Sequence, residues 1–257
     1  MDIIGTSLSR DGYLLTEVGA PATAGETGTL SFTIRDADGT PVTAFAQSHG
    51  RALHLIVVRT DGTGYRHLHP ELDAASGVWS TTVTWDAAGS YRLFADATPL
   101  GADGVTLTRT IDVEGDLRPA KHRGERRHVT VDGIEVHLDG TLRTGDGGVL
   151  TATVSEHGHP VQRLEPYLGA YGHLVALREG DLAYLHVHAL GETPAAGDLS
   201  GPEVAFHASA PTAGRYFLFL DFQVDGRVRT ASFVVEASGA APTATADHHE
   251  HHAVHTH

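Results

Sequence analysis

The sequence predicts an all-β protein made of two tandem antiparallel β-sandwiches, immunoglobulin-like or cupredoxin-like, followed by a disordered His-rich C-terminal tail. Three observations lead to this prediction: short β-rich segments separated by turn residues, a repeat at a fixed offset, and a low-complexity end. With 257 residues, 40% of them hydrophobic, the chain can form two domains of about 110–120 residues, each with its own core.

Segments rich in Val, Thr, Leu, Phe and Tyr recur through the first half, each bounded by Gly, Pro or Asp. This composition is typical of strands, and seven of them in about 110 residues indicate a sandwich. No amphipathic helix with capping residues stands out. The expected strands of the first half are 12–18, 29–36, 53–59, 65–69, 79–85, 90–95 and 106–113.

The repeat is clearest where residues 54–69 (HLIVVRTDGTGYRHLH) align without a gap on residues 173–188 (HLVALREGDLAYLHVH). Residues 89–96 (GSYRLFAD) likewise match residues 214–221 (GRYFLFLD). The period is far longer than that of a solenoid, so we interpret it as a duplicated sandwich. The predicted units are sandwich one at 1–115, a linker at 116–128, sandwich two at 129–236 and the tail at 237–257.

The linker and the tail have unusual compositions. The linker is basic in an acidic protein, which indicates a solvated connector or, alternatively, a docking patch for an acidic surface; its basic residues are Arg118, Lys121, Arg123, Arg126 and Arg127.

The tail cannot bury a core, and its histidines predict metal capture unless the tail is incidental or artificial. The tail histidines that we assign as candidate ligands are His248, His249, His251 and His252.

Composition restricts the function. A formal charge of −14 argues against nucleic acid or an anionic membrane as the main partner. Cysteine is absent and Met1 is the only methionine, which excludes disulfides, thiolate catalysis and the sulfur ligands that Cu(I) prefers. Nineteen histidines leave imidazole and carboxylate as ligands, and these favour Cu(II), Zn(II) or Ni(II).

Two absences bear on location. The N-terminus lacks the basic start and apolar core of a signal peptide, and no apolar run reaches 18 residues, so we expect no membrane insertion. A cytoplasmic protein and a protein whose export segment has been lost both fit this pattern.

The spacing of the repeat predicts a metal site on each of two hairpins. With turns centred on Asp61-Gly62 and on Gly180-Asp181, the first histidine of each copy lies opposite the last, and all three share one face. Directly opposed Cβ atoms are about 5 Å apart, close enough for two imidazoles to hold one ion. The candidate ligands are His54, His67 and His69 in sandwich one, and His173, His186 and His188 in sandwich two. The alternative is that they are buried packing residues.

Two aspartates could support these ligands. Asp96 and Asp221 stand at the ends of the matching segments 89–96 and 214–221. Each is a candidate fourth ligand or a hydrogen-bond acceptor for a ligand imidazole. The alternative is that each begins a turn.

The paired motifs 54–70 and 167–188, followed by GSYRLFAD and GRYFLFLD, resemble a family of exported two-repeat proteins of actinobacteria. That family is similar to YtkA-like and cupredoxin-like or immunoglobulin-like modules associated with copper. The resemblance covers about residues 10–236. It implies two β-sandwiches, an extracytoplasmic location and a connection with copper.

These observations predict a non-enzymatic protein that binds Cu(II) or Zn(II) for metal capture or homeostasis. The competing hypothesis is a structural or adhesive module that binds another protein through a sandwich face or the linker. A third is a metal-dependent hydrolase, since three histidines with an open position could activate water. We find no nucleophile elbow, phosphate loop or His-Glu-x-x-His motif to support catalysis.

Overall fold

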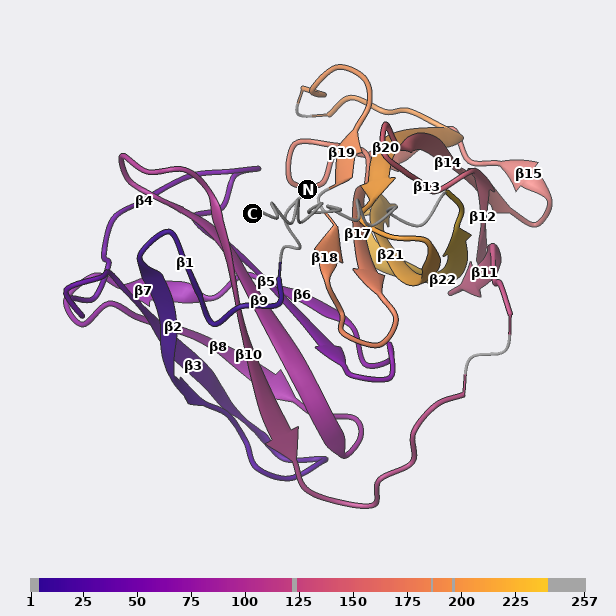
Figure 1. The fold of residues 1–257 in the computed structure, drawn as a ribbon. Helices are drawn as coiled ribbons and strands as arrows, with labels where there is room; N and C mark the ends of the chain where they lie inside the picture. Colours follow the sequence, from indigo (N-terminus) through magenta and orange to yellow (C-terminus); the bar gives the residue numbers. More distant parts are fainter. Residues whose placement is uncertain (1–4, 122–123, 186, 196, 240–257) are drawn as a thin grey trace, which may run out of the picture.

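The computed structural model describes residues 5–239 except 122–123, 186 and 196, and every regular element in these ranges is a β-strand (Figure 1). The predicted all-β fold is confirmed. No helix among these residues has the length and apolar character needed to cross a membrane.

The first sandwich contains ten strands in two sheets. One sheet has the order β1-β2-β3-β8-β7, and the other has the order β10-β9-β5-β6 with β4 paired to β9. Between them lies a core that includes Phe32, Trp79 and Trp85. The strands are β1 (Ser9–Arg10), β2 (Tyr13–Gly19), β3 (Thr27–Arg35), β4 (Phe45–Ala46), β5 (Leu53–Arg59), β6 (Arg66–Leu68), β7 (Glu71–Asp73), β8 (Val78–Thr84), β9 (Gly89–Pro99) and β10 (Val105–Val113).

The second sandwich repeats this plan. One sheet has the order β11-β12-β14-β20-β13, with β15 on β14 and β19 on β20, and the other has the order β16-β21-β17-β18, with β22 on β21. Phe206 and Phe222 lie in its core. The strands are β11 (His128–Val131), β12 (Ile134–Gly140), β13 (Arg143–Thr144), β14 (Gly148–Glu156), β15 (His159–Pro160), β16 (Leu164–Glu165), β17 (His173–Arg178), β18 (Tyr184–Leu185), β19 (Val187–Ala189), β20 (Glu203–Ala210), β21 (Gly214–Val224) and β22 (Arg227–Ala237).

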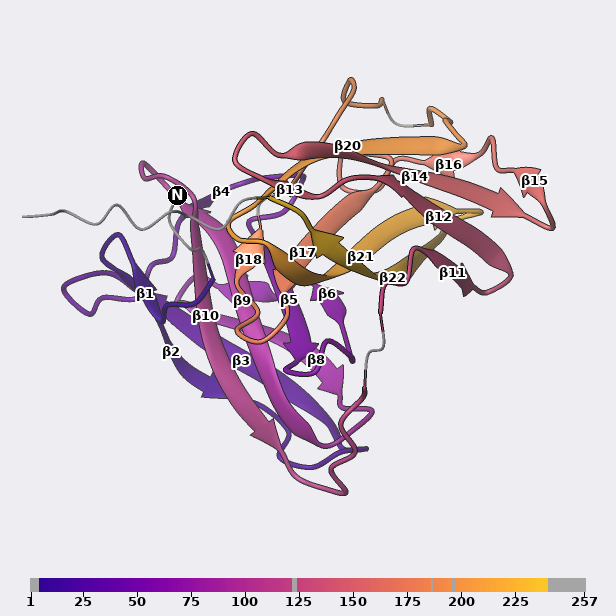
Figure 2. The ribbon, with the colours of Figure 1, turned by 45° about the vertical axis from the view of Figure 1, so that its right-hand side comes forward.

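The two sandwiches pack against each other through a third hydrophobic cluster. On β5, Leu55 and Val57 point into the first core, whereas Ile56 and Val58 point to the opposite face and are also buried. They meet Phe217 and other residues of β17, β21 and β22. The sheets that carry β5 and β21 therefore form the two middle layers of a four-sheet stack, as Figure 2 shows from the side.

Two contacts show how closely these middle sheets approach. The Tyr65 and Phe219 rings stack with centroids 4.2 Å apart and planes within 8°. Gly62, in the β5–β6 turn, has φ of +77°, and a Cβ there would lie 2.6 Å from the Phe217 ring. This position needs glycine both for its left-handed backbone and for the space that the aromatic ring occupies.

The β5–β6 turn is fixed by a buried ion pair. Arg59 donates from Nε to Asp61 Oδ1 (2.9 Å) and from a terminal nitrogen to Oδ2 (2.6 Å), and the two side chains are 8% and 15% exposed. Asp61 also accepts from the backbone N–H of Ala120 at 2.7 Å. The linker is thereby attached to the turn. Arg178 and Asp181 form the corresponding ion pair in the second sandwich.

Replacing Asp61 by asparagine should destabilise the protein by about 3 kcal/mol, because the buried Arg59 loses its charged partner. Burial on its own would raise the Asp61 pKa, but the hydrogen bonds from Arg59, Ala120 and Thr63 outweigh it and hold this pKa at about 2. The ordinary value is 3.8, so the ionised carboxylate stabilises the folded state above about pH 4, and this contribution is lost as the pH falls toward 2.

Denaturant titrations of the parent and Asp61→Asn at pH 7 and pH 3 measure this effect. The difference in unfolding free energy should shrink at pH 3. An equal difference at both pH values would contradict the assigned role of the carboxylate.

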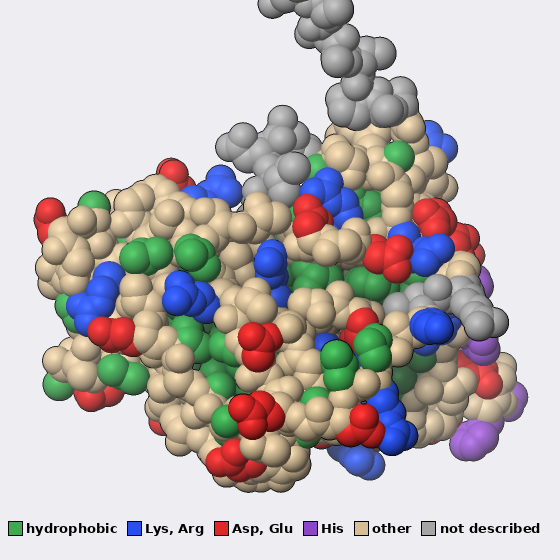
Figure 3. All heavy atoms as spheres, turned by 60° about the horizontal axis from the view of Figure 1, so that its bottom comes forward, with side chains coloured by type: hydrophobic (Ala, Val, Ile, Leu, Met, Phe, Trp, Pro, Cys, Tyr) green, Lys and Arg blue, Asp and Glu red, His purple; other side chains and the backbone are tan. Residues whose placement is uncertain are grey.

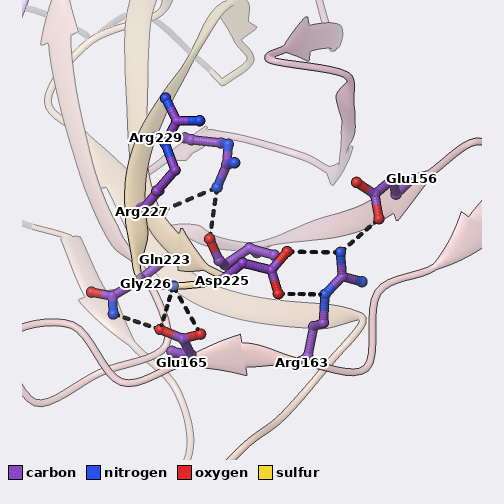
Figure 4. A network of polar contacts seen from close by, with 9 residues as sticks. Glu156, Arg163, Glu165, Gln223, Asp225, Gly226, Arg227 and Arg229 are labelled. Atoms are coloured by element: carbon purple, nitrogen blue, oxygen red, sulfur yellow. Dashed lines mark hydrogen bonds and ion pairs between the residues drawn. The ribbon is translucent and has the colours of Figure 1, made fainter.

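A second polar network closes the far end of the β21–β22 hairpin (Figure 4). Arg163 binds both carboxylate oxygens of Asp225, at 2.9 and 3.0 Å, and also Glu156 at 2.6 Å. The carboxylate of Glu165 accepts from the backbone N–H of Gly226. These groups are partly solvated, so we assign them a role in fixing the hairpin tip and only a small contribution to stability.

Two basic residues of the linker are not free to form the docking patch for an acidic surface that the sequence offers as an alternative. Arg126 donates from Nε to the backbone carbonyl of Ser232 at 3.2 Å, and Arg127 donates to the backbone carbonyls of Leu138 and Gly140. At least these two basic side chains are therefore used within the fold. On the face in Figure 3, acidic and basic side chains alternate with small groups of hydrophobic ones.

Candidate metal centre

The first hairpin has the register that the sequence predicts. Ile56 pairs with His67, and Leu55 with Leu68, which places His54 opposite His69. The rings of His54 and His69 have centroids 5.2 Å apart, and those of His67 and His69 are 4.8 Å apart. Each of the three residues offers one ring nitrogen within 4.8 Å of the others. These three imidazoles form a group that could hold a metal ion, and we call it the three-His centre.

The outer nitrogens of two of these rings have hydrogen-bond acceptors. His54 Nε2 lies 3.0 Å from the carbonyl oxygen of Ser48, and His67 Nδ1 lies 2.9 Å from Asp221 Oδ2. A carbonyl and a carboxylate only accept, so each outer nitrogen must carry the proton. The inner nitrogens, His54 Nδ1 and His67 Nε2, are then both unprotonated when the rings are neutral.

These two inner nitrogens face each other at 2.9 Å. Two lone pairs at this distance repel unless a cation lies between or beside them. His69 adds to the imbalance, because its Nε2 is buried and has no hydrogen-bond partner among the described residues. Two facing lone pairs and a His69 nitrogen without a hydrogen-bond partner among the described residues therefore lie in one group of imidazoles, an arrangement that suits a cation.

Burial also keeps two of these rings neutral. Desolvation is the largest cause, and together with the neighbouring imidazoles it lowers the pKa of His54 to about 4 and that of His69 to about 3. The pKa of His173 is also lowered, chiefly by desolvation. Neutral imidazole is the form that binds a metal, so His54 and His69 are already in the binding form at neutral pH.

Two further histidines adjoin the centre. His49, on the loop before β5, has its ring 6.1 Å from that of His54 and 5.3 Å from that of His173. The His173 ring comes from the second sandwich and lies 6.4 Å from that of His67. His173 Nε2 lies 2.7 Å from the carbonyl oxygen of Tyr167, the repeat equivalent of the His54–Ser48 contact.

The centre opens into a cleft of about 970 Å³ between the sandwiches. His54, His67 and His173 line this cleft, and Arg51 lies at its edge. A bound ion would therefore be reachable from solvent on one side.

Among the described residues, the second hairpin does not gather three histidines as the first hairpin does. Its register near the turn is as expected, with Ala176 opposite Leu185. The predicted pairing of His173 with His188 is wrong, because the β17–β18 ladder ends at Ala176 and Leu185, and His188 pairs instead with His207 on β20 in the other sheet. Val187, next to His188, packs onto the second core.

Asp96 and Asp221 also differ from prediction. Neither ends a strand or begins a turn, because β9 continues to Pro99 and β21 to Val224. Asp96 lies opposite His54 and lines the cleft. Asp221 has the predicted role of an acceptor for an imidazole, but that imidazole is His67 of the other sandwich, a partner that the sequence did not indicate.

Several predicted ligands lie outside the described residues. These are His186 and the tail histidines His248, His249, His251 and His252. Their roles as metal ligands stay predictions.

A family model matches residues 8–115 and 129–239, one segment for each sandwich. The chain belongs to the DUF8832 family. That name stands for a domain of unknown function. Membership of DUF8832 therefore supports the duplicated fold, and any functional argument must come from the residues of the site. No curated protein matches this DUF8832 chain.

Among solved structures, this DUF8832 protein is similar to bacterial sandwich proteins. The S-layer protein SbsC is 12% identical, with a TM-score of 0.26 over 91% of this chain and 28% of its own. The D00-D0 domain of intimin is 11% identical, with a TM-score of 0.25 over 87% and 98% of the two chains. The adhesin InvE of Yersinia pseudotuberculosis is 15% identical, with a TM-score of 0.26 over 91% and 61%. We draw no function from similarity at this level.

Proposed function

We propose that this protein is a non-enzymatic binding protein for Cu(II) or Zn(II), with its ion at the three-His centre. One observation carries the proposal: His54 Nδ1 and His67 Nε2 face each other while their outer nitrogens lie on acceptors, and His69 completes a group of three ring nitrogens within 4.8 Å of one another. Asp221 behind His67 is the kind of outer acceptor that commonly orients a metal-bound imidazole.

The types of ligand favour Cu(II). In the general order of affinities for divalent metals, nitrogen ligands bind Cu(II) more tightly than Zn(II). His54 Nδ1 and His67 Nε2, 2.9 Å apart, are close enough to bind the same ion. The absence of cysteine, and of any methionine beyond Met1, also fits Cu(II) rather than Cu(I).

An extracytoplasmic setting belongs to the same proposal. Its support is the resemblance of the repeat motifs to exported, copper-associated modules. In an oxidising compartment copper is held as Cu(II), the form that these nitrogen ligands suit.

Calorimetric titration with Cu(II) and with Zn(II) tests the function directly. The protein for this test is the full chain with its tail histidines replaced by serine, which we call the tail-substituted chain. We expect one ion per chain, with Cu(II) bound more tightly than Zn(II). A tail-substituted chain that folds normally but binds neither ion would refute the proposal.

The pH dependence of binding should be shallow. Three unperturbed histidines would give a fall in affinity through about pH 6.5, with the logarithm of Kd changing by up to about three per pH unit below it. Because the pKa values of His54 and His69 are about 4 and about 3, these two rings bind no proton at pH 5 to 6.5. At most one ligand proton then competes, so the slope should not exceed about one. Cu(II) titrations at pH 5.0, 5.75 and 6.5 measure this slope, and a value near three would contradict it.

A further inference from the structure

We infer that the second sandwich contributes to metal binding at the three-His centre. Asp221 orients the His67 imidazole so that it can bind the ion, and metal binding is therefore coupled to docking of the two sandwiches. This inference rests on the proposed function. It concerns one centre shared by both repeats, where the sequence indicated a separate site in each.

The contact between the sandwiches is direct and buried. His67 is on β6 of the first sandwich and is 8% exposed, and Asp221 is on β21 of the second and is 2% exposed. Asp221 Oδ2 accepts from His67 Nδ1 at 2.9 Å and from the Tyr65 hydroxyl at 3.2 Å. Its other oxygen accepts from Thr230 at 2.5 Å. The carboxylate is thus held in place before any ion binds.

Asp221 decides which nitrogen of His67 is available. With its proton on Nδ1 for the carboxylate, His67 presents the lone pair of Nε2 to the centre. Without the carboxylate, His67 could carry its proton on Nε2 and donate it to His54 Nδ1, only 2.9 Å away. That hydrogen bond would remove the repulsion between the two rings and occupy both lone pairs. Asp221 therefore keeps the centre open for a cation.

The hydrophobic interface sets the position of Asp221. Phe219 points to the same face of β21 as Asp221, and its ring stacks on Tyr65 of the first sandwich. Tyr65 and His67 in turn point to the same face of the first hairpin. Undocking the sandwiches would separate His67 from its acceptor, so the two equilibria must influence each other by equal free energies.

Substitution of Asp221 tests the inference in the tail-substituted chain. Asp221→Leu removes the acceptor and keeps a side chain that branches at Cγ, and Thr230→Val is the matched control, since it removes a partner of the same carboxylate without touching His67. We expect Asp221→Leu to raise the Kd for Cu(II) by about tenfold to hundredfold, as for other outer partners of ligand histidines. Thr230→Val should change it by less than about threefold.

The ring nitrogen of His67 that carries the proton is a second measurable quantity, and a loss of stability alone would not change it. Nitrogen-15 NMR of the metal-free protein at pH 7 should show the proton on Nδ1 in the parent and in Thr230→Val. It should show the proton on Nε2 in Asp221→Leu. A parent His67 protonated on Nε2, or an Asp221→Leu chain that retains the parent Kd, would overturn the inference.

Hydrogen exchange in the parent covers the case in which Asp221→Leu does not fold. Saturating Zn(II) should slow amide exchange in β21 of the second sandwich as well as in β5 and β6. Protection confined to the first sandwich would overturn the coupling. If the parent binds neither Zn(II) nor Cu(II), the proposed function fails, and the His67 proton position still tests the Asp221 contact independently.

Discussion

Replacing His67 by alanine is expected to raise the Kd for Cu(II) by at least about a hundredfold. His67 contributes one of the three nitrogens of the three-His centre, and its ring lies 5.2 Å from that of His54 and 4.8 Å from that of His69. Loss of an outer partner of a ligand histidine costs about tenfold to hundredfold in affinity, and loss of the ligand itself should cost more. Calorimetry or competition with a chelator of known affinity, on the tail-substituted chain, measures the change.

His137→Ala is the matched control for this prediction. His137 is an exposed histidine on β12 whose ring nitrogen contacts Asp139, away from the centre. Its loss should leave the Kd unchanged within about twofold. Equal affinities for His67→Ala and the parent would place the ion elsewhere. A parent without bound metal, in a normally folded chain, would favour the competing interpretation of a structural module with packing histidines.

Replacing Phe219 by alanine is expected to destabilise both sandwiches, although it alters only the second. The Phe219 side chain is 1% exposed and lies in the hydrophobic cluster between the sandwiches. Removing a buried phenylalanine costs about 3–5 kcal/mol, and the lost stacking on Tyr65 adds about 1 kcal/mol. Tyr65 and Ile56 of the first sandwich lose packing at the same time.

The loss of stability in each sandwich can be measured separately, because both tryptophans, Trp79 and Trp85, lie in the first core. Their fluorescence reports unfolding of the first sandwich, whereas circular dichroism reports both. Phe219→Ala should lower the denaturant midpoint by both probes. The control is Phe222→Ala, on the opposite face of β21, which should affect mainly the dichroism. A fluorescence midpoint unchanged by Phe219→Ala would mean that the sandwiches fold independently.

The short-range pattern of the sequence was sufficient for the longer strands of the first sandwich and for the grouping of three histidines, but it missed the short strands β1, β4 and β7. Alternation of side chains and the Asp61-Gly62 turn predict that His54 lies opposite His69 and that His67 shares their face, and the observed register agrees. The same reasoning failed at His188. There the chain changes sheets, and which sheet a short segment joins depends on packing against the core, as Val187 shows.

One signal for the interface was present in the sequence. Segments 55–58 (LIVV) and 217–220 (FLFL) are apolar at every position, without the alternation of a sheet with one solvated face. Such runs indicate burial on both faces. They show that a sheet is covered and leave open what covers it. The partner of His67 was therefore beyond reach, because Asp221 is 154 residues away along the chain.

The sequence by itself determined the all-β class, the duplication, the exclusion of sulfur ligands and the convergence of three histidines on one hairpin, because each follows from composition or from spacing within a few residues. The tertiary structure alone decided that Asp221 of the second repeat adjoins the three-His centre of the first. Docking of the middle sheets brings Asp221 to His67, and that contact, with the Ser48 carbonyl at His54, leaves the inner nitrogens unprotonated. Which nitrogen of an imidazole carries the proton depends on the acceptor beside it in space, and spacing along the chain does not specify that acceptor.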